Sequence, residues 1–206
     1  MDHQHTDFDE RAATWDDDPA KVERARAVAD AISQQVTIDG STRMLEYGAG
    51  TGLFTQAVWE ATGSIGPVTL ADTSSGMREQ MEKKVAAGVL PDARVVDLDL
   101  SHGAPSGERF DLIVSVLVLH HIDPLRPVLA AFAELLADGG HLCVVDLVAE
   151  DGSFHGEGFH GHHGFDPAEL AGWLGDAGFA QVEVAPCHEI ERDGGTYPMF
   201  LAVART

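Results

Sequence analysis

The sequence predicts an α/β fold, a doubly wound, seven-stranded sheet that is mostly parallel and ends in an antiparallel hairpin strand. Two observations carry this prediction. Apolar, β-branched runs alternate with segments of helical spacing, as in parallel sheets that helices cover on both faces. The last two strand-like runs are separated only by residues 191–195, which leaves no room for a helix and makes the two an antiparallel pair.

The expected elements follow one another in a regular order. A first helix is predicted over residues 19–36, where apolar side chains recur at helical spacing and Pro19 suits the first turn. The expected strands are 44–47, 68–71, 94–98, 112–117, 142–148, 182–190 and 197–204. The expected helices between them are 53–61, 75–87, 125–136 and 167–177. In such a sheet, ligands bind outside the carboxyl ends of the strands.

Length and charge limit the classes of protein and partner. A chain of 206 residues fits a single domain, predicted over residues 1–206 with an N-terminal cap and first helix over 1–38 and a core over 40–206. Its 34 acidic and 13 basic residues give a net charge of −21, which argues against nucleic acid and anionic membranes as partners. Without a segment of 18 apolar residues or a basic, apolar leader, we expect a cytoplasmic protein. The sequence is silent on the oligomeric state.

The turn after the first expected strand is the most informative segment. Glu46 is followed by Gly48, Gly50 and Gly52, which permit positive φ and let the backbone approach a ligand closely. A dinucleotide fingerprint needs glycine where this chain has Leu53, and a phosphate-binding P-loop needs a Gly-Lys pair that is absent. The loop therefore favours a nucleotide-like cofactor without a phosphate, of which S-adenosyl-L-methionine (SAM) is the common example. A tight turn with no ligand is the alternative.

An acid follows the second expected strand at a spacing from the glycine loop that is typical of ribose binding. Asp72 lies 20 residues after Gly52, the offset at which a carboxylate accepts ribose hydroxyls in dinucleotide sites. A helix N-cap is the alternative, because Thr73 and two serines precede an expected helix.

Three segments together resemble the class I SAM-dependent methyltransferases. They are E-x-G-x-G-x-G at residues 46–52, FDLIVSVLVLHHI at 110–122 and LLADGGHL at 135–142. Segment 110–122 is similar to the small-molecule branch of this family, which includes the ubiquinone and menaquinone biosynthesis methyltransferases. The resemblance covers roughly residues 40–150, and the reversed last strand agrees with the Rossmann-like sheet of the family.

The resemblance implies a set of cofactor-binding residues. An acid after the third strand binds the adenine amino group and the next apolar residue packs on the ring. We assign these roles to Asp99 and Leu100. Asp99 lies twelve residues before Asp111 of the next strand, which is a typical gap in the family, whereas Asp97 lies fourteen residues before it. Ser115 and Val116 are expected beside the methionine end of SAM. The full set is Glu46, Gly48, Ala49, Gly50, Gly52, Asp72, Thr73, Asp99, Leu100, Ser115 and Val116.

The histidines at the end of the fourth strand are the candidate catalytic residues. The resemblance implies that Leu119, His120 and His121 face the transferable methyl group or the methyl acceptor. An imidazole takes a proton near neutral pH, so either histidine suits a general base if the acceptor nucleophile is protonated. A packing or orienting role is the alternative, because methyl transfer depends first on an oriented nucleophile in a site that excludes water.

A second histidine cluster and an aromatic pair leave further alternatives open. Residues 155–163 hold four histidines and Glu157, with ligand-like spacing at His160 and His162. This glycine-rich run is interpreted as a flexible polar lid, as substrate-facing histidines or as a metal site, and no metal ligand is assigned. Phe8 and Trp15 resemble the family's segment over the cofactor, or they anchor the first helix.

These patterns predict a SAM-dependent methyltransferase that acts on a small-molecule acceptor. A SAM- or S-adenosylhomocysteine-binding protein without methyltransferase activity is the alternative, because it would keep every cofactor motif. A nicotinamide oxidoreductase is disfavoured by Leu53 and by the antiparallel ending. The sequence leaves the acceptor and its accepting atom undecided.

Overall fold

The computed structural model describes residues 8–206, and the N-terminal start of the predicted cap lies outside them. The chain divides into two compact units, Met1–Asp99 and Leu100–Thr206, which are described separately. The prediction of a single domain stays a prediction. Within the described part of the chain, no helix combines the length and apolar character needed to cross a membrane.

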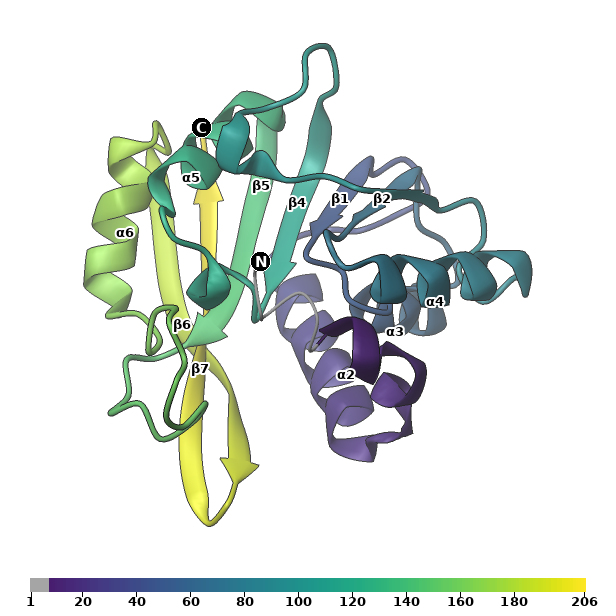
Figure 1. Cartoon of the computed structure of the whole chain (residues 1–206). Helices are drawn as coiled ribbons and strands as arrows, with labels where there is room; N and C mark the ends of the chain where they lie inside the picture. The colour runs from purple at the N-terminus through teal and green to yellow at the C-terminus, as the bar shows by residue number, and fades with distance from the viewer. Residues whose placement is uncertain (1–7) are drawn as a thin grey trace. The chain divides into compact units, whose positions relative to one another are not determined.

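The first unit alternates strands with helices, as Figure 1 shows. Its β1, β2 and β3 are parallel, with β2 between the other two. All residues of β1 and β2 are buried, which agrees with the mostly apolar sequence of the two strands. The elements are η1 (Ala12–Asp17), α2 (Pro19–Ser33), β1 (Met44–Tyr47), α3 (Leu53–Thr62), β2 (Val68–Ala71), α4 (Ser75–Ala86) and β3 (Arg94–Val96).

The second unit carries the other four strands of the seven-stranded sheet. Strand β5 pairs in parallel with β4, and β7 runs antiparallel to both β5 and β6. This confirms the predicted fold class and its antiparallel ending. The elements are η2 (Leu100–His102), β4 (Phe110–Val116), η3 (Leu119–His121), α5 (Arg126–Leu135), β5 (Leu136–Leu147), α6 (Pro167–Asp176), β6 (Gln181–Arg192) and β7 (Gly195–Arg205).

The largest error in the predicted elements is the start of the fifth strand. The sequence predicted a helix that ends at residue 136 and a strand that begins only at residue 142. Residues 136–141 instead extend β5, with Leu136 opposite Phe110 and His141 opposite Leu112 across an irregularity in the ladder. Gly139, at φ 74°, makes this irregular start possible.

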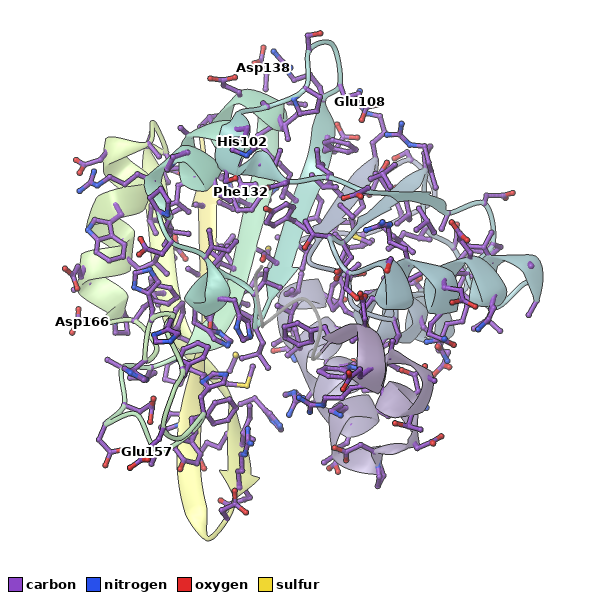
Figure 2. All side chains as sticks on the ribbon, in the orientation of Figure 1. His102, Glu108, Phe132, Asp138, Glu157 and Asp166 are labelled. Carbon is purple, nitrogen blue, oxygen red and sulfur yellow. The ribbon has the colours of Figure 1, made fainter. Side chains whose placement is uncertain are left out.

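Side chains separate by polarity in the second unit, as Figure 2 shows for its labelled residues. Phe132 on α5 is fully buried, whereas Asp138, Glu157 and Asp166 are exposed and point outward. Asp166 also caps α6 by accepting the backbone N–H groups of Ala168 and Glu169. Part of the strong negative charge of the chain is thus carried by exposed acids in loops and at helix caps.

The β6–β7 turn offers a test with a matched control. Gly194 has φ 81°, where an L-residue is strained, while Gly172 lies inside α6 and an added Cβ there meets no atom within 4 Å. We expect Gly194→Ala to lower the free energy of unfolding by about 1–2 kcal/mol. Gly172→Ala should raise it by about 0.5–1 kcal/mol. Urea denaturation of both variants checks this, and equal effects of the two would contradict it.

Candidate cofactor and acceptor sites

The glycine loop takes the left-handed backbone conformation that its sequence predicts. Gly48, Gly50 and Gly52 have φ of 71°, 58° and 78°. At Gly50 an added Cβ meets no atom within 4 Å, so the backbone there borders open space. At Gly52, which begins α3, the Cβ would lie 2.9 Å from Leu90 Cδ1. Glycine is favoured at Gly52 chiefly by its positive φ, and Gly50 leaves room for a ligand.

Asp72 holds this loop in place. Its Oδ2 accepts the N–H of Gly50 at 2.7 Å, and its Oδ1 accepts the N–H of Ser74 at 2.8 Å. The N-cap of α4 is Ser74, whose hydroxyl oxygen accepts the N–H of Met77. The N-cap alternative for Asp72 was therefore wrong. Both carboxylate oxygens of Asp72 thus accept backbone N–H groups, and a contact with ribose hydroxyls stays a prediction.

Glu46 is a buried acid at the end of β1. Its side chain accepts a hydrogen bond from the Thr55 hydroxyl and is 3% exposed. Burial raises the pKa of Glu46 to about 7, and the Thr55 hydrogen bond and the Lys84 charge only partly oppose this. Glu46 is thus near half-protonation at neutral pH, beneath the loop that it precedes.

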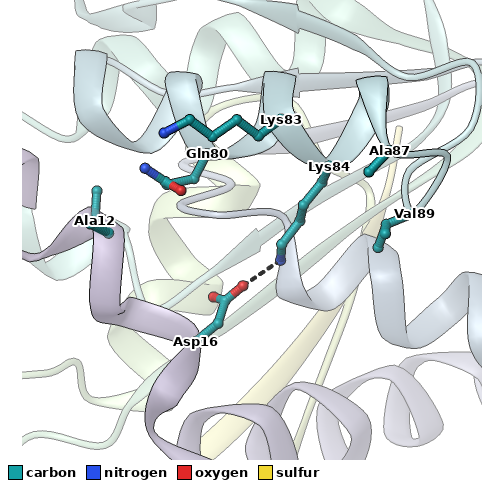
Figure 3. Close-up of a pocket in the computed structure, with 8 residues that line it drawn as sticks. Ala12, Asp16, Gln80, Lys83, Lys84, Ala87 and Val89 are labelled. Carbon is teal, nitrogen blue, oxygen red and sulfur yellow. Dashed lines mark ion pairs between the residues drawn. The ribbon is translucent and has the colours of Figure 1, made fainter.

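The N-terminal segment is tied to the same loop. Asp16 accepts the Thr51 hydroxyl and pairs with Lys84 of α4 at 2.6 Å, the ion pair drawn in Figure 3. The pocket in Figure 3 lies between η1 and α4, and its lining does not include the glycine loop or Asp72. We therefore do not place the cofactor in this pocket.

The aromatic pair of the N-terminal segment packs locally. The rings of Phe8 and Trp15 lie 5.9 Å apart, and the Lys21 ammonium lies 3.9 Å from the centre of the Trp15 ring. Asp9 beside them accepts the Ser74 hydroxyl and the Gly76 N–H. These contacts support the anchoring interpretation of the pair, whereas a contact with cofactor stays a prediction.

The predicted adenine residues fall in different environments. Asp97 pairs with Arg78 at 3.0 Å, and Asp97 and Asp99 are both exposed. The choice of Asp99 over Asp97 and an adenine contact stay predictions. Leu100, in the second unit, is 0% exposed and offers no uncovered face to a ring.

The carboxyl end of β4 contributes a buried hydroxyl. Ser115 is fully buried, and its Oγ has no hydrogen-bond partner among the described residues. Val116 and the next residue are partly exposed, and Leu117 has φ 57°, an uncommon conformation for leucine. The chain thus turns sharply after β4, which places η3 and its histidines.

His120 forms a buried pair with Asp146 of β5. Its Nδ1 lies 2.6 Å from Asp146 Oδ1, and its backbone N–H donates to Asp146 Oδ2 at 3.3 Å. The two side chains are 2% and 0% exposed. An ionised carboxylate only accepts hydrogen bonds, so Nδ1 is the nitrogen that donates to Asp146, and Nε2 is the nitrogen left for another partner. We did not predict Asp146, although an acid inside the apolar run LCVVDL at 142–147 signals a buried partner.

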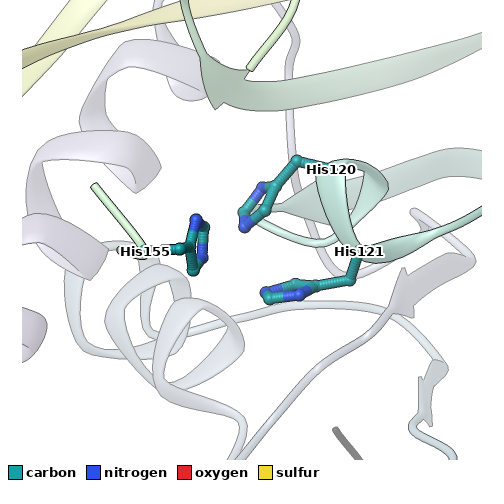
Figure 4. Close-up of side chains that lie close together, drawn as sticks. All are labelled: His120, His121 and His155. Atoms are coloured by element: carbon teal, nitrogen blue, oxygen red, sulfur yellow. The ribbon is translucent and has the colours of Figure 1, made fainter. Parts of the chain in front are cut away.

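His121 and His155 lie beside His120 in the same unit, as Figure 4 shows. The ring centres of His120 and His121 are 4.1 Å apart, and His155 lies 5.0 Å and 5.3 Å from them. Burial lowers the pKa of His121 to about 2 and that of His155 to about 4, with a smaller contribution from the neighbouring imidazoles. At neutral pH both rings are uncharged.

The ligand-like spacing of His160 and His162 does not correspond to a cluster. His162 Nε2 lies 3.1 Å from the Ile122 carbonyl oxygen, so this ring fixes the loop, and His160 is exposed. His155 instead joins the two histidines of η3, a contact over more than thirty residues that spacing along the chain does not show.

A family model described as a methyltransferase domain matches residues 20–184. The chain therefore belongs to this methyltransferase domain family, which confirms the methyltransferase part of the prediction. The narrower resemblance to ubiquinone and menaquinone enzymes stays a prediction.

Individual relatives are distant. An uncharacterized methyltransferase of Schizosaccharomyces pombe, C1347.09, is 27% identical over 157 residues, which are 68% of this chain and 54% of that protein. The biotin biosynthesis bifunctional protein BioCD of Bordetella avium is 32% identical over 130 residues, 61% of this chain and 26% of that protein. The chain thus spans about half or less of these curated relatives.

Among solved structures, the DhpI-SAM-HEP complex has a TM-score of 0.72 with this chain. The sequences are 19% identical, and the match covers 98% of this chain and 96% of that one. At this identity, the likeness concerns the fold.

The buried Glu46 predicts a pH dependence of stability. Its folded-state pKa of about 7 exceeds the usual 4.5, so the folded protein holds a proton that the unfolded chain releases. The resulting stability is complete below about pH 4.5 and is lost as the pH rises through 7. Between pH 5 and pH 8, wild type should lose on the order of 3 kcal/mol of its free energy of unfolding through Glu46. Glu46→Gln keeps an acceptor for Thr55 and should not show this loss.

Urea denaturation at pH 5 and pH 8 measures this difference. The exposed Glu82, changed to Gln, is the matched control and should behave as wild type at both pH values. An identical pH dependence in Glu46→Gln and wild type would show that Glu46 is ionised in the folded protein.

Proposed function

We propose that this chain transfers a methyl group from SAM to a small-molecule acceptor. The observation that carries the proposal is the glycine loop, held by Asp72 and open at Gly50, in a chain of the methyltransferase domain family. The acidic composition disfavours polyanionic acceptors. The printed name of the BioCD relative, a biotin biosynthesis protein, also supports an acceptor from small-molecule metabolism.

The residues of the first unit fit the adenosine part of SAM. Gly50 supplies backbone that a ligand can approach, and the Asp72 carboxylate, which accepts the Gly50 N–H, is of the kind that accepts ribose hydroxyls. Thr73 follows Asp72 and is exposed. The loop offers no lysine for a phosphate, which agrees with a cofactor that has none.

The residues of the second unit fit the reacting groups. SAM, when bound, supplies an electrophilic methyl group on a sulfonium. The buried Ser115 hydroxyl has no partner among the described residues, and such a hydroxyl gains from any polar ligand group that reaches it. His120 Nε2 then accepts a hydrogen bond from the O–H or N–H of the acceptor, which orients the nucleophile for in-line attack. Asp146 is the positioning residue for that imidazole.

Calorimetric titration with S-adenosylhomocysteine tests the cofactor proposal, with NADH as the control ligand. Wild-type protein should bind S-adenosylhomocysteine and not NADH. Asp72→Ala should weaken that binding by about 1–3 kcal/mol, because charge-assisted hydrogen bonds to the ribose are lost. Asp97→Ala is the matched control, since Asp97 pairs with Arg78 at the next strand end.

An unchanged affinity in Asp72→Ala would restrict Asp72 to holding the loop. Absence of S-adenosylhomocysteine binding in wild type would overturn the proposed function.

Methyl transfer itself separates an enzyme from a cofactor-binding protein. In a screen of metabolites with oxygen, nitrogen, carbon and sulfur nucleophiles, SAM turnover should require one acceptor class. His120→Asn and His121→Asn should each lower turnover at least tenfold while the affinity for S-adenosylhomocysteine stays within twofold, because the histidines act on the acceptor. Turnover equal to wild type in both variants would remove the histidines from the reaction.

A further inference from the structure

Three histidines from two distant parts of the chain converge in the second unit. His120 and His121 belong to η3, and His155 belongs to the loop that follows β5. One nitrogen from each ring lies within 4.8 Å of the others. In Figure 4 the three rings surround a common space.

The chemistry of this three-histidine cluster is that of a metal-ligand set. It consists of three imidazoles whose ligand atoms lie close together, and a neutral imidazole is the form that coordinates metal ions. His155 Nδ1 is buried and has no hydrogen-bond partner within residues 8–206. Three clustered imidazoles therefore present lone pairs to one another, an arrangement that a shared cation stabilises.

The surroundings of His120 match the outer shell of a metal site. Ligating histidines almost always donate their second ring N–H to a carboxylate or carbonyl, which fixes the tautomer and raises the basicity of the ligand nitrogen. Asp146 does this for His120 at 2.6 Å. The nitrogen that is left for a metal is Nε2.

His155 is held in place although its loop is rich in glycine. Phe159 stacks on its ring at 3.9 Å with an angle of 8° between the planes. Glu150 accepts the N–H groups of Gly152 and Phe154, which closes the turn that leads to His155. The aromatic ring also supplies an apolar wall on one side of the cluster.

The same loop is bound directly to η3. The N–H of His162 donates to the His120 carbonyl oxygen at 2.7 Å. Gly161 passes so close to this oxygen that an added Cβ would lie 2.1 Å from it. The loop that carries His155 is therefore packed against the residues that carry the other two ligands, and it is not a detached polar lid.

We propose that His120, His121 and His155 bind one divalent transition-metal ion, of the zinc, cobalt or iron class, and leave a further coordination position open. Three nitrogens at about 2.0–2.1 Å from a tetrahedral ion lie about 3.3 Å apart, so small ring rotations from the present separation complete the site. Asp146 pairs with His120, Glu150 is a second acid near His155, and Arg192 is a cation near His155. The proposal does not depend on methyl transfer.

A metal ion here would change how the acceptor is activated. The Nε2 lone pair of His120 can accept a hydrogen bond or coordinate a cation, and it cannot do both at once. A metal ion held by the three histidines would offer its open position to an oxygen, nitrogen or sulfur atom of the acceptor and would stabilise the deprotonated form of that atom.

The test is titration of untagged, chelator-stripped protein with Co²⁺, followed by its visible absorption, with Zn²⁺ as competitor. Wild type should bind one equivalent with the intense bands of tetrahedral cobalt, and Zn²⁺ should abolish them. His121→Ala and His155→Ala should each weaken binding by more than the 10–100-fold that loss of an outer-shell partner costs. Asp146→Asn, which alters an outer-shell partner, should weaken cobalt binding by 10–100-fold.

His160→Ala is the matched control, because His160 lies in the same loop, is exposed and stands outside the cluster. It should bind cobalt as wild type does. Circular dichroism and thermal melting confirm that each variant is folded, and the partly exposed His155 is the variant least coupled to the core.

Equal cobalt affinity in wild type and His155→Ala, or loss of binding in His160→Ala, would overturn the proposal. S-adenosylhomocysteine titration of the same preparations keeps the two proposals apart. Metal binding without S-adenosylhomocysteine binding would overturn only the proposed function, and the reverse result would overturn only the metal site.

Discussion

The second unit depends on one buried carboxylate. Asp146 is 0% exposed inside an apolar strand, where an ionised group without partners would cost several kcal/mol. Three N–H groups meet it: the ring and the backbone of His120, and the backbone of Leu147. These bonds require the chain to fold back after β4. The His120 carbonyl oxygen then receives the His162 N–H, so the same carboxylate also determines where the next loop lies.

The first unit contains two carboxylates whose surroundings give them different tasks. Glu46 is buried with one hydroxyl donor, which does not offset the loss of hydration, so its pKa rises to about 7. Asp72 is partly exposed and receives two backbone N–H groups. Glu46 therefore acts beneath the loop as a group that can donate or accept a hydrogen bond at neutral pH. Asp72 shapes the loop from the side where backbone borders open space.

Local patterns in the sequence predicted most of the fold. Strand β1, strand β2 and the start of α3 have the predicted first residues, because apolar runs and positive-φ glycines act within a few positions. The start of β5 was missed, since its turn-like residues 136–141 are overruled by pairing with β4. A local sequence pattern does not show such pairing between strands that are distant in the sequence.

The same difference between local properties and contacts of distant residues applies to the candidate site. The glycine loop was predictable, because φ and spacing are local properties. The partner of His120 was not, because Asp146 lies 26 residues away, and the apolar run around it shows only that some partner is needed. The role of Asp72 could not be decided between cap and ligand, since Ser74 two positions later can serve as the cap equally well. His155 entered the cluster through a loop whose path depends on contacts with η3.

Packing alone does not account for histidine at all three positions of the cluster. Phe159 already provides the apolar surface there, and a phenyl ring costs less to bury than an imidazole with an unsatisfied nitrogen. Protonation does not relieve this cost, because burial and the neighbouring rings both oppose a positive charge on His121 and His155. A single proton would also satisfy only one or two lone pairs. A divalent ion accepts all three at once, and its charge exceeds what one imidazolium could supply. The arrangement therefore favours a ligand that accepts several lone pairs, which distinguishes a cation from both a proton and a packed side chain.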